Sequence, residues 1–419
     1  MNAVHKLTLA LTLAFAANVR ADYLPDPKAA EAALWASPMV AQARGEFAAQ
    51  TFRSEGLQRG REEWTVGADI AQRQIQTTPK DNMGEWGVAL SRPIRMPARA
   101  EADRALAGAL NAHAEASLGE ALHESGRQLL TLWFDWLNEA SQSTVWLKHV
   151  ALAEQQLDAV NTRIRLGEAP RSDRASAEAA LAQARLQQKQ AAMRFAQARN
   201  RLLAQFPGLP LTADETPPQP VEPAGSADDY VNVVLEHNHE LFRARRQAEV
   251  LQAEARQLAK RRGVDPNVGV YYKNEMGGNE HLIGLNLGLT LPGGARHSDQ
   301  QAVEQLAATA QEAAIQLEQR LRLEARADFE TAVAQVANWQ QANHAALALA
   351  EAARLAARAY DLGEGSLDQV LVNRRLAQEG QLMAQQAQLA ALAAHTRLKL
   401  DSHQLWPLDV DTDHAHAHP

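Results

Sequence analysis

The sequence predicts a mainly α-helical fold in which a strand hairpin followed by a long helical hairpin occurs twice. Landmarks recur with constant spacing: a proline closes a strand at Pro97 and at Pro292, and a Leu-Gly-Glu turn stands at 166–168 and at 362–364. Residues 295–360 contain no Pro or Gly, which is typical of a very long helix. Aromatic residues make up only 5% of the chain. A repeat of this length indicates a duplicated domain rather than a short solenoid motif.

The composition excludes several classes of function. The net charge is −8 and the isoelectric point is about 6.0, so the chain lacks the basic surface that nucleic-acid binding requires. Cysteine is absent, which excludes disulfides, thiol catalysis and cysteine-based zinc sites. The sequence contains no Gly-rich phosphate loop, no Gly-x-Ser-x-Gly and no His-Glu-x-x-His motif. We therefore expect neither an enzyme nor a cofactor-binding protein.

The N-terminal residues 1–21 have the features of a secretory signal peptide. Lys6 precedes an apolar run at 7–17, and Val19-Arg20-Ala21 places small residues at the cleavage positions. The run is shorter than the roughly 20 residues that a membrane-spanning helix needs. No cysteine follows, so we do not expect an N-acylated lipoprotein. No other segment resembles a transmembrane helix, so membrane insertion would have to use β-strands.

The first copy of the repeat is expected at residues 22–206. A helix at 27–61, interrupted at Ser37-Pro38, opens it. Residues 64–71 then alternate with period two, which indicates a strand with one apolar face. The remaining elements expected in this copy are strands at 63–74 and 85–96 and long helices at 98–161 and 170–203. A Pro-rich polar linker, residues 207–224, follows.

The second copy, residues 225–408, begins with a helix at 228–262. Aliphatic residues occupy every second position from Ile283 to Leu291. Transmembrane strands need about 9 to 11 residues of such alternation, although a half-buried soluble hairpin has the same pattern. The remaining elements expected in this copy are strands at 265–275 and 281–292, long helices at 295–361 and 366–402, and a His-rich disordered tail at 409–419.

The helical runs are too long for an ordinary globular core. Between Val303 and Trp339, apolar or small residues recur at a mean spacing of about 3.6, which keeps one stripe on one face of a nearly straight helix. A helix over 295–360 would form a rod of roughly 100 Å. Its many alanines provide too little side-chain volume for a hydrophobic core within one chain. We therefore expect these stripes to pack against neighbouring helices, including those of other subunits.

Paired strands followed by rods of this length, present twice, resemble the TolC-like outer-membrane efflux proteins. The resemblance covers nearly the whole chain after the signal, and it rests on the order of elements rather than on residue identity. It implies a homotrimer in which each subunit gives four strands to one twelve-stranded barrel in outer-membrane lipid. The helices would continue this barrel as a tunnel through the periplasm. The implied partners are a periplasmic membrane-fusion adaptor and an inner-membrane RND transporter.

The resemblance also implies site residues at the two helix-turn tips. The positions matching those that meet the adaptor are Leu166, Gly167, Leu362 and Gly363. The candidates for a pore constriction are Asp173 and Asp368, which differ by one residue in their distance from the preceding turn glycine. A ring of carboxylates at a narrow pore end would favour cations.

Histidine-rich segments suggest heavy-metal cations as the cargo. The tail places His414, His416 and His418 near two aspartates, and imidazole and carboxylate groups suit Zn, Co, Ni or Cu. Together with the short length and the missing acylation cysteine, this tail resembles the heavy-metal, CzcC-like branch of the family. The segment 237–240, His-Asn-His-Glu, is a weaker metal candidate. We interpret isolated histidines such as His123 and His344 as packed or solvated.

Two other interpretations stay open at this stage. The duct could serve drug efflux or type I secretion, because selection can reside in the inner-membrane pump. Alternatively, the chain could be a periplasmic coiled-coil scaffold or adaptor without a pore. That interpretation explains the rods but not the four alternating strands.

Overall fold

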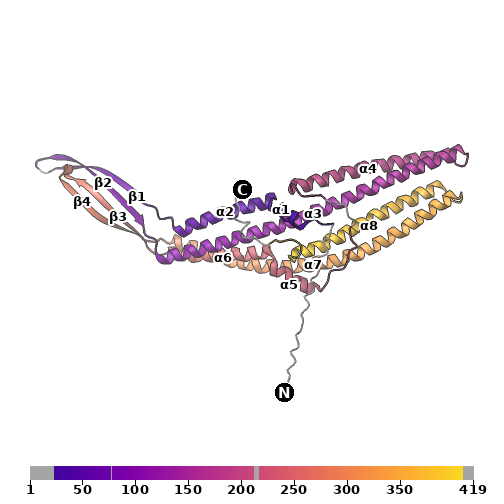
Figure 1. Cartoon of the computed structure of the whole chain (residues 1–419). Helices are drawn as coiled ribbons and strands as arrows, with labels where there is room; N and C mark the ends of the chain where they lie inside the picture. The colour runs from indigo at the N-terminus through magenta and orange to yellow at the C-terminus, as the bar shows by residue number, and fades with distance from the viewer. Residues whose placement is uncertain (1–22, 77, 212–216, 409–419) are drawn as a thin grey trace, which may run out of the picture.

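The computed structural model describes residues 23–76, 78–211 and 217–408. The chain forms a long rod with a four-stranded sheet at one end and two helix turns at the other (Figure 1). About 72% of the described residues are helical, which confirms the mainly α fold class. None of the helices in the described ranges is both long enough and apolar enough to cross a lipid bilayer.

The two copies of the repeat contain the same α-helices and strands in the same order, and the second has an additional 3₁₀ turn. The first copy comprises α1 (Pro27–Trp35), α2 (Pro38–Arg59), β1 (Thr65–Ile75), β2 (Asp81–Pro93), α3 (Pro97–Arg165) and α4 (Arg171–Gln205). The second comprises α5 (Ala227–His237), α6 (His239–Arg261), β3 (Asp265–Glu275), the 3₁₀ turn η1 (Met276–Gly278), β4 (Glu280–Thr290), α7 (Ala295–Asp361) and α8 (Leu367–Asp401).

Each copy opens with a helix that is broken by a polar cap. Ser37 accepts a hydrogen bond from the backbone N–H of Val40, and Pro38 stands at the first position of α2. Asn238 has an extended backbone and accepts a bond of 2.8 Å from the N–H of Leu241. The expectation of one continuous helix at 228–262 is therefore wrong, because Asn238 caps α6 and ends α5.

The second strand starts earlier than the alternation of its side chains indicates. We expected it at 85–96, but β2 spans Asp81–Pro93. Its first residues are polar and pair with the end of β1, where Asp81 lies opposite Ile75 and Asn82 opposite Gln74. Backbone pairing with β1, rather than an apolar pattern, therefore sets the start of this strand.

The sheet is antiparallel throughout, in the order β1-β2-β3-β4, so the β2–β3 pair joins the two copies. Its register aligns apolar side chains into rows, one of which runs through Val66, Leu90, Val270 and Leu285. Because every second residue of a strand shares a face, these rows form one apolar face across all four strands. The face is exposed: Leu285 retains 79% of its accessible surface.

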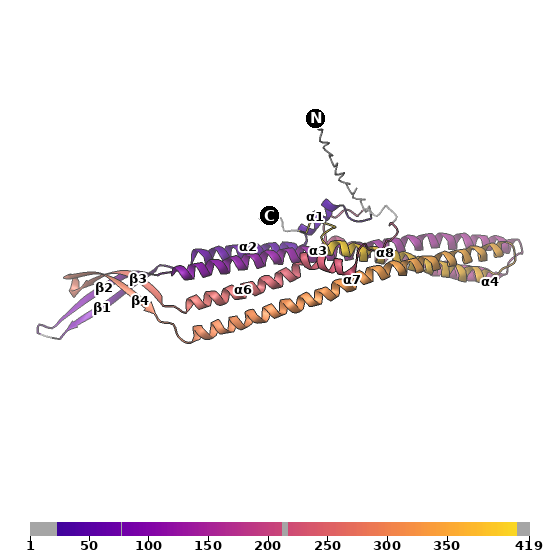
Figure 2. The ribbon, with the colours of Figure 1, turned by 90° about the horizontal axis from the view of Figure 1, so that it is seen from below.

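The helices pair within and between the copies. α3 packs against α4 and α7 against α8 in the half with the turns, while α2, α3, α6 and α7 pack together in the half next to the sheet (Figures 1 and 2). The largest cluster of buried side chains lies between these halves, and Trp133 at its centre donates a hydrogen bond of 2.9 Å to the carbonyl of Tyr23. The α7 stripe is buried or half-buried from Ala314 to Val336, whereas Leu306 is exposed.

Candidate functional site

The candidate site lies at the two helix turns, at the end of the rod opposite the sheet (Figure 1). Both turns have the same backbone hydrogen bonds. In the first, Glu168 N–H donates to the Arg163 carbonyl and Gly167 N–H to the Ile164 carbonyl. In the second, Glu364 and Gly363 make the matching bonds to the carbonyls of Ala359 and Tyr360. These paired bonds define a Schellman motif, which satisfies the last carbonyls of a helix.

Each turn exposes a leucine next to a glycine in the left-handed conformation. Gly167 has φ +79° and Gly363 has φ +80°, values that side chains with a Cβ rarely adopt. The preceding residues, Leu166 and Leu362, are 67% and 58% exposed. The four residues expected to contact an adaptor therefore form two small apolar projections at the apex of the rod.

The two acidic candidates occupy different positions on their helices. Asp173 is the third residue of α4 and half-buried, whereas Asp368 is the second residue of α8 and exposed. One residue corresponds to a rotation of about 100° around a helix. The structure therefore does not bring Asp173 and Asp368 to equivalent places.

A contact between the copies at the tips was not found from the sequence. The guanidinium of Arg163, on α3, lies 4.4 Å from the ring centre of Tyr360, on α7. Arg163 Nη1 also donates a hydrogen bond of 2.9 Å to the Tyr360 carbonyl. Tyr360 is buried with Val160 and Val370. This pair joins the two helical hairpins of the chain through a cation–π contact and a charged hydrogen bond.

In the sequence, only a difference in residue type between the two copies could have indicated this contact. The matching turn bonds align Arg163 with Ala359 and Ile164 with Tyr360. Each member of the pair therefore stands where the other copy has an aliphatic residue. The pair also borders a cavity of about 520 Å³ that Asp361 and Arg374 line. Burial lowers the pKa of Arg374, and the negative charge of Asp361 opposes this shift.

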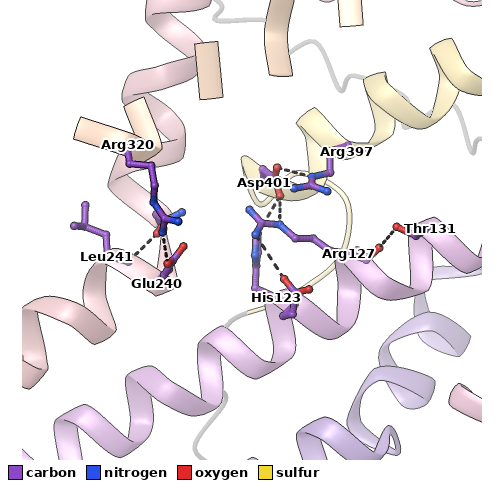
Figure 3. A network of polar contacts seen from close by, with 10 residues as sticks. His123, Arg127, Thr131, Glu240, Leu241, Arg320, Arg397 and Asp401 are labelled. Atoms are coloured by element: carbon purple, nitrogen blue, oxygen red, sulfur yellow. Dashed lines mark hydrogen bonds and ion pairs between the residues drawn. The ribbon is translucent and has the colours of Figure 1, made fainter. Parts of the chain in front are cut away.

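The histidines that the sequence singled out lie in different places. His414, His416 and His418 lie outside the described residues, so their predicted metal contact stays a prediction. His344 is exposed on α7, whereas His123 is buried on α3 (Figure 3), with its ring centre 6.0 Å from that of His239 in the 237–240 segment. In the part of the chain that the structure describes, no three His, Cys, Asp or Glu side chains are arranged to hold a metal ion.

No protein-family model matches the chain, and no curated protein matches its sequence. Solved structures do match it over most of its length. The outer-membrane channel OprN superimposes with a TM-score of 0.72 at 16% identity, covering 90% of this chain and 88% of that chain. The Campylobacter jejuni CmeC outer membrane channel gives 0.71 at 13% identity, covering 94% and 90%. The open state of the Neisseria gonorrhoeae MtrE outer membrane channel gives 0.63 at 18% identity, covering 93% and 91%.

These likenesses extend over the sheet and the helical rod alike, because about nine-tenths of each chain takes part. They do not single out the heavy-metal branch that the His-rich tail suggested. At such low identities the comparison establishes the fold. The chain therefore has the fold of one subunit of a TolC-like outer-membrane channel, with a four-stranded sheet and a duplicated helical hairpin.

Proposed function

We propose that this protein is the outer-membrane exit duct of a tripartite efflux system, which conducts its cargo passively from the periplasm to the exterior. Three copies would close a barrel of twelve strands in the outer membrane. The helices would continue that barrel as a tunnel into the periplasm. The fold that the chain shares with outer-membrane channels supports this proposal.

The observation that carries the proposal is the sheet itself. Its apolar face is exposed across four strands, and β1 and β4 are edge strands whose outer backbone groups pair with no strand in the described chain. In hydrocarbon an unpaired edge costs several kcal/mol per group, so a sheet in a membrane must close on itself. Four strands are too few to close, whereas edges joined between identical subunits form a complete ring.

The rod has the dimensions of a periplasmic tunnel. α7 contains 67 residues and would be roughly 100 Å long at about 1.5 Å per residue. Exposed leucines and isoleucines along it, such as Leu323 and Leu347, suit contacts with neighbouring subunits. We propose that the apex residues Leu166, Gly167, Leu362 and Gly363 meet a membrane-fusion adaptor, and that an inner-membrane RND transporter supplies the cargo.

We propose heavy-metal cations as the cargo, on the basis of the carboxylates near the tips. Asp368 is exposed at the start of α8, where three copies could form a ring that attracts cations. Asp173, which is half-buried, would contribute less. Deletion of the gene should sensitise cells to Zn, Co, Cd, Ni or Cu. Unchanged tolerance to all five metals, together with new sensitivity to drugs or dyes, would contradict a metal cargo and favour an organic one.

The duct proposal is tested by purification and single-channel recording. The full chain should need detergent, sediment as a trimer and produce discrete conductance steps in planar bilayers. A control with Leu285→Arg should yield no such steps. A chain that stays monodisperse in water without detergent and gives no conductance would refute the duct and favour a scaffold.

A further inference from the structure

A cavity of about 380 Å³ lies at the junction of the helical rod and the sheet, where the ends of α2 and α6 meet the beginnings of α3 and α7 (Figure 1). We call it the junction cavity. Its volume lies within the range of roughly 300–1,000 Å³ that small-ligand sites occupy. Both copies of the repeat line it, with Arg61 and Glu62 from the α2–β1 connection, Arg261 from the end of α6 and Asp299 from the start of α7.

Two groups of ion pairs hold the walls of the junction cavity in place. Asp103 is 4% exposed and accepts a hydrogen bond of 2.6 Å from Arg95 Nη2. Asp265 accepts hydrogen bonds from Arg99 and, at 2.7 Å, from Arg296 Nη2. Because two guanidinium groups share the Asp265 carboxylate, this part of the wall keeps one positive charge in excess. The walls are therefore slightly basic.

Four other charged side chains that line the cavity form no ion pair within residues 23–76, 78–211 and 217–408. They are two cations, Arg61 and Arg261, and two carboxylates, Glu62 and Asp299. Glu62 and Arg261 are half-buried, whereas Arg61 and Asp299 are exposed. A half-buried charge without a partner loses part of its hydration and gains no ion pair in return. The cavity therefore suits a ligand that carries both a negative and a positive group.

The cavity lies just beyond the end of the apolar face that is nearest to the rod. Trp64 directly precedes β1, is 61% exposed, and shares this face with Val66 because alternate residues of a strand point to the same side. The guanidinium of Arg92 lies 5.4 Å from the Trp64 ring centre. Tryptophan is enriched at membrane–water interfaces. Arg61 and Glu62 come just before Trp64, which places them at the depth of lipid headgroups.

Aromatic side chains also mark the other end of the apolar face. Trp86 on β2 lies beside Tyr272 on β3, with ring centres 5.5 Å apart, and the Tyr272 hydroxyl forms a hydrogen bond of 2.9 Å with His281 Nδ1. β4 contains 11 residues, which cover a height of roughly 25 Å at about 3.3 Å per residue and a tilt of about 40°. Outer-membrane barrels have an apolar band of about this height between two aromatic girdles. The dimensions of the sheet therefore support a membrane boundary at Trp64.

We propose that the junction cavity binds the headgroup of a zwitterionic phospholipid, phosphatidylethanolamine, in the periplasmic leaflet. Arg61 and Arg261 hold its phosphate, because a guanidinium presents paired N–H donors that match phosphate oxygens. Glu62 and Asp299 accept hydrogen bonds from its ammonium group. The bound lipid ties the α2–β1 connection to α6 and α7 and so fixes the depth of the sheet. This inference rests on the membrane insertion of the sheet that we propose above.

The test measures lipid retention by native mass spectrometry of the full chain purified in detergent. Dioleoylphosphatidylethanolamine, dioleoylphosphatidylglycerol and dioleoylglycerol are titrated separately. The first should bind at least tenfold more tightly than dioleoylglycerol, which lacks the headgroup, and also more tightly than the phosphatidylglycerol, which lacks the amine. The double variant Arg61→Gln with Arg261→Gln should weaken phosphatidylethanolamine binding by tenfold or more.

A second double variant tests the carboxylates independently of the arginines. Glu62→Gln with Asp299→Asn removes the two acceptors for the ammonium group, so it should abolish the preference for phosphatidylethanolamine over phosphatidylglycerol. This result stays informative if the arginine variant does not fold.

The matched control removes the same charge from the same helices away from the cavity. Arg44→Gln with Arg246→Gln alters α2 and α6 at positions about 20 Å along each helix from its end. This variant should bind phosphatidylethanolamine as the wild type does. Inorganic phosphate at 10 mM should leave the lipid bound, because it offers neither the amine nor the acyl chains.

Three results would overturn the proposal. They are equal binding of phosphatidylethanolamine by the wild type and both double variants, equal binding of all three lipids by the wild type, and full displacement of the lipid by inorganic phosphate. Lipid retention is measured separately from conductance. A channel that conducts but shows no headgroup preference refutes this inference alone, whereas a chain that binds the headgroup but never conducts refutes the duct alone.

Discussion

An arginine in place of Leu285 tests whether the apolar face of the sheet lies against lipid. Leu285 stands at the middle of β4, in the row with Val66, Leu90 and Val270, and is 79% exposed. An Arg at the midplane of a lipid-facing strand costs about 2–4 kcal/mol. Three copies would multiply this to about 6–12 kcal/mol per trimer, a large part of the stability of a typical folded domain.

The neighbouring residue supplies the matched control. Asn286 is also exposed, but it belongs to the opposite face, in the row with Thr65, Ser91 and Gly269. In a closed barrel that face lines the aqueous interior, so Asn286→Arg should assemble normally and change only the ion selectivity of the pore.

The assay compares the two variants in refolding into lipid vesicles. The fraction of heat-resistant trimer is measured first, followed by conductance in planar bilayers. Leu285→Arg should lose most of the trimer and Asn286→Arg should keep it. Equal assembly of both variants, or loss of trimer in Asn286→Arg alone, would refute the orientation of the sheet that we propose.

Two further predictions concern the tips. Arg163→Ala removes the cation–π contact and the hydrogen bond to Tyr360, and should destabilise the tip half of the rod by about 1–3 kcal/mol. Hydrogen exchange at 357–371 should then be faster, whereas Arg165→Ala, at an exposed residue, should have little effect. Equal exchange rates in the two variants would contradict a structural role for the Arg163–Tyr360 pair. Gly363→Ala forces a Cβ into a left-handed backbone and should cost about 1–2 kcal/mol in chemical unfolding, whereas Gly56→Ala, inside α2 with open space around it, should stabilise by about 0.5–1 kcal/mol. If Gly363→Ala left the free energy of unfolding unchanged, a side chain at this position would not strain the turn.

The strands and helices with strong sequence periodicity were predictable because a local pattern of apolar residues, or the lack of helix-breaking residues, was sufficient to indicate each of them. The alternation from Ile283 to Leu291 indicated a strand with one apolar face, and the register of the sheet confirms that Leu285 lies in a row of apolar residues. The helix α7 followed from the absence of Pro and Gly over 295–360. The break at Asn238 was missed because an Asn before a helix is compatible with both a cap and a helix interior.

The contacts between distant segments could not be read from local patterns. Arg163 and Tyr360 are separated by 197 residues, about the length of one repeat, and neither belongs to a recognisable motif. The contacts of His403 with His123 and His239 were missed for the same reason. The segment 237–240 drew attention as a metal candidate, but nothing in the sequence indicates that His403 and His123 lie against it. Such contacts depend on the packing of α3, α6 and α8, which local periodicity does not determine.

In the duct that we propose, the duplication would account both for the symmetry and for the departure from it. Two copies per chain give four strands and four long helices, from which three chains would build a nearly sixfold tunnel. At the tips, however, the repeat aligns Arg163 with Ala359 and Tyr360 with Ile164. The repeat-related pair, Ala359 and Ile164, cannot form the cation–π contact that Arg163 and Tyr360 make. Asp173 is the third residue of α4, whereas Asp368 is the second residue of α8. In the proposed trimer each subunit would engage Arg163 with its own Tyr360, so the contacts between subunits would use other side chains. We therefore expect the tips to open and close with threefold rather than sixfold symmetry, with each pair of hairpins moving as one unit.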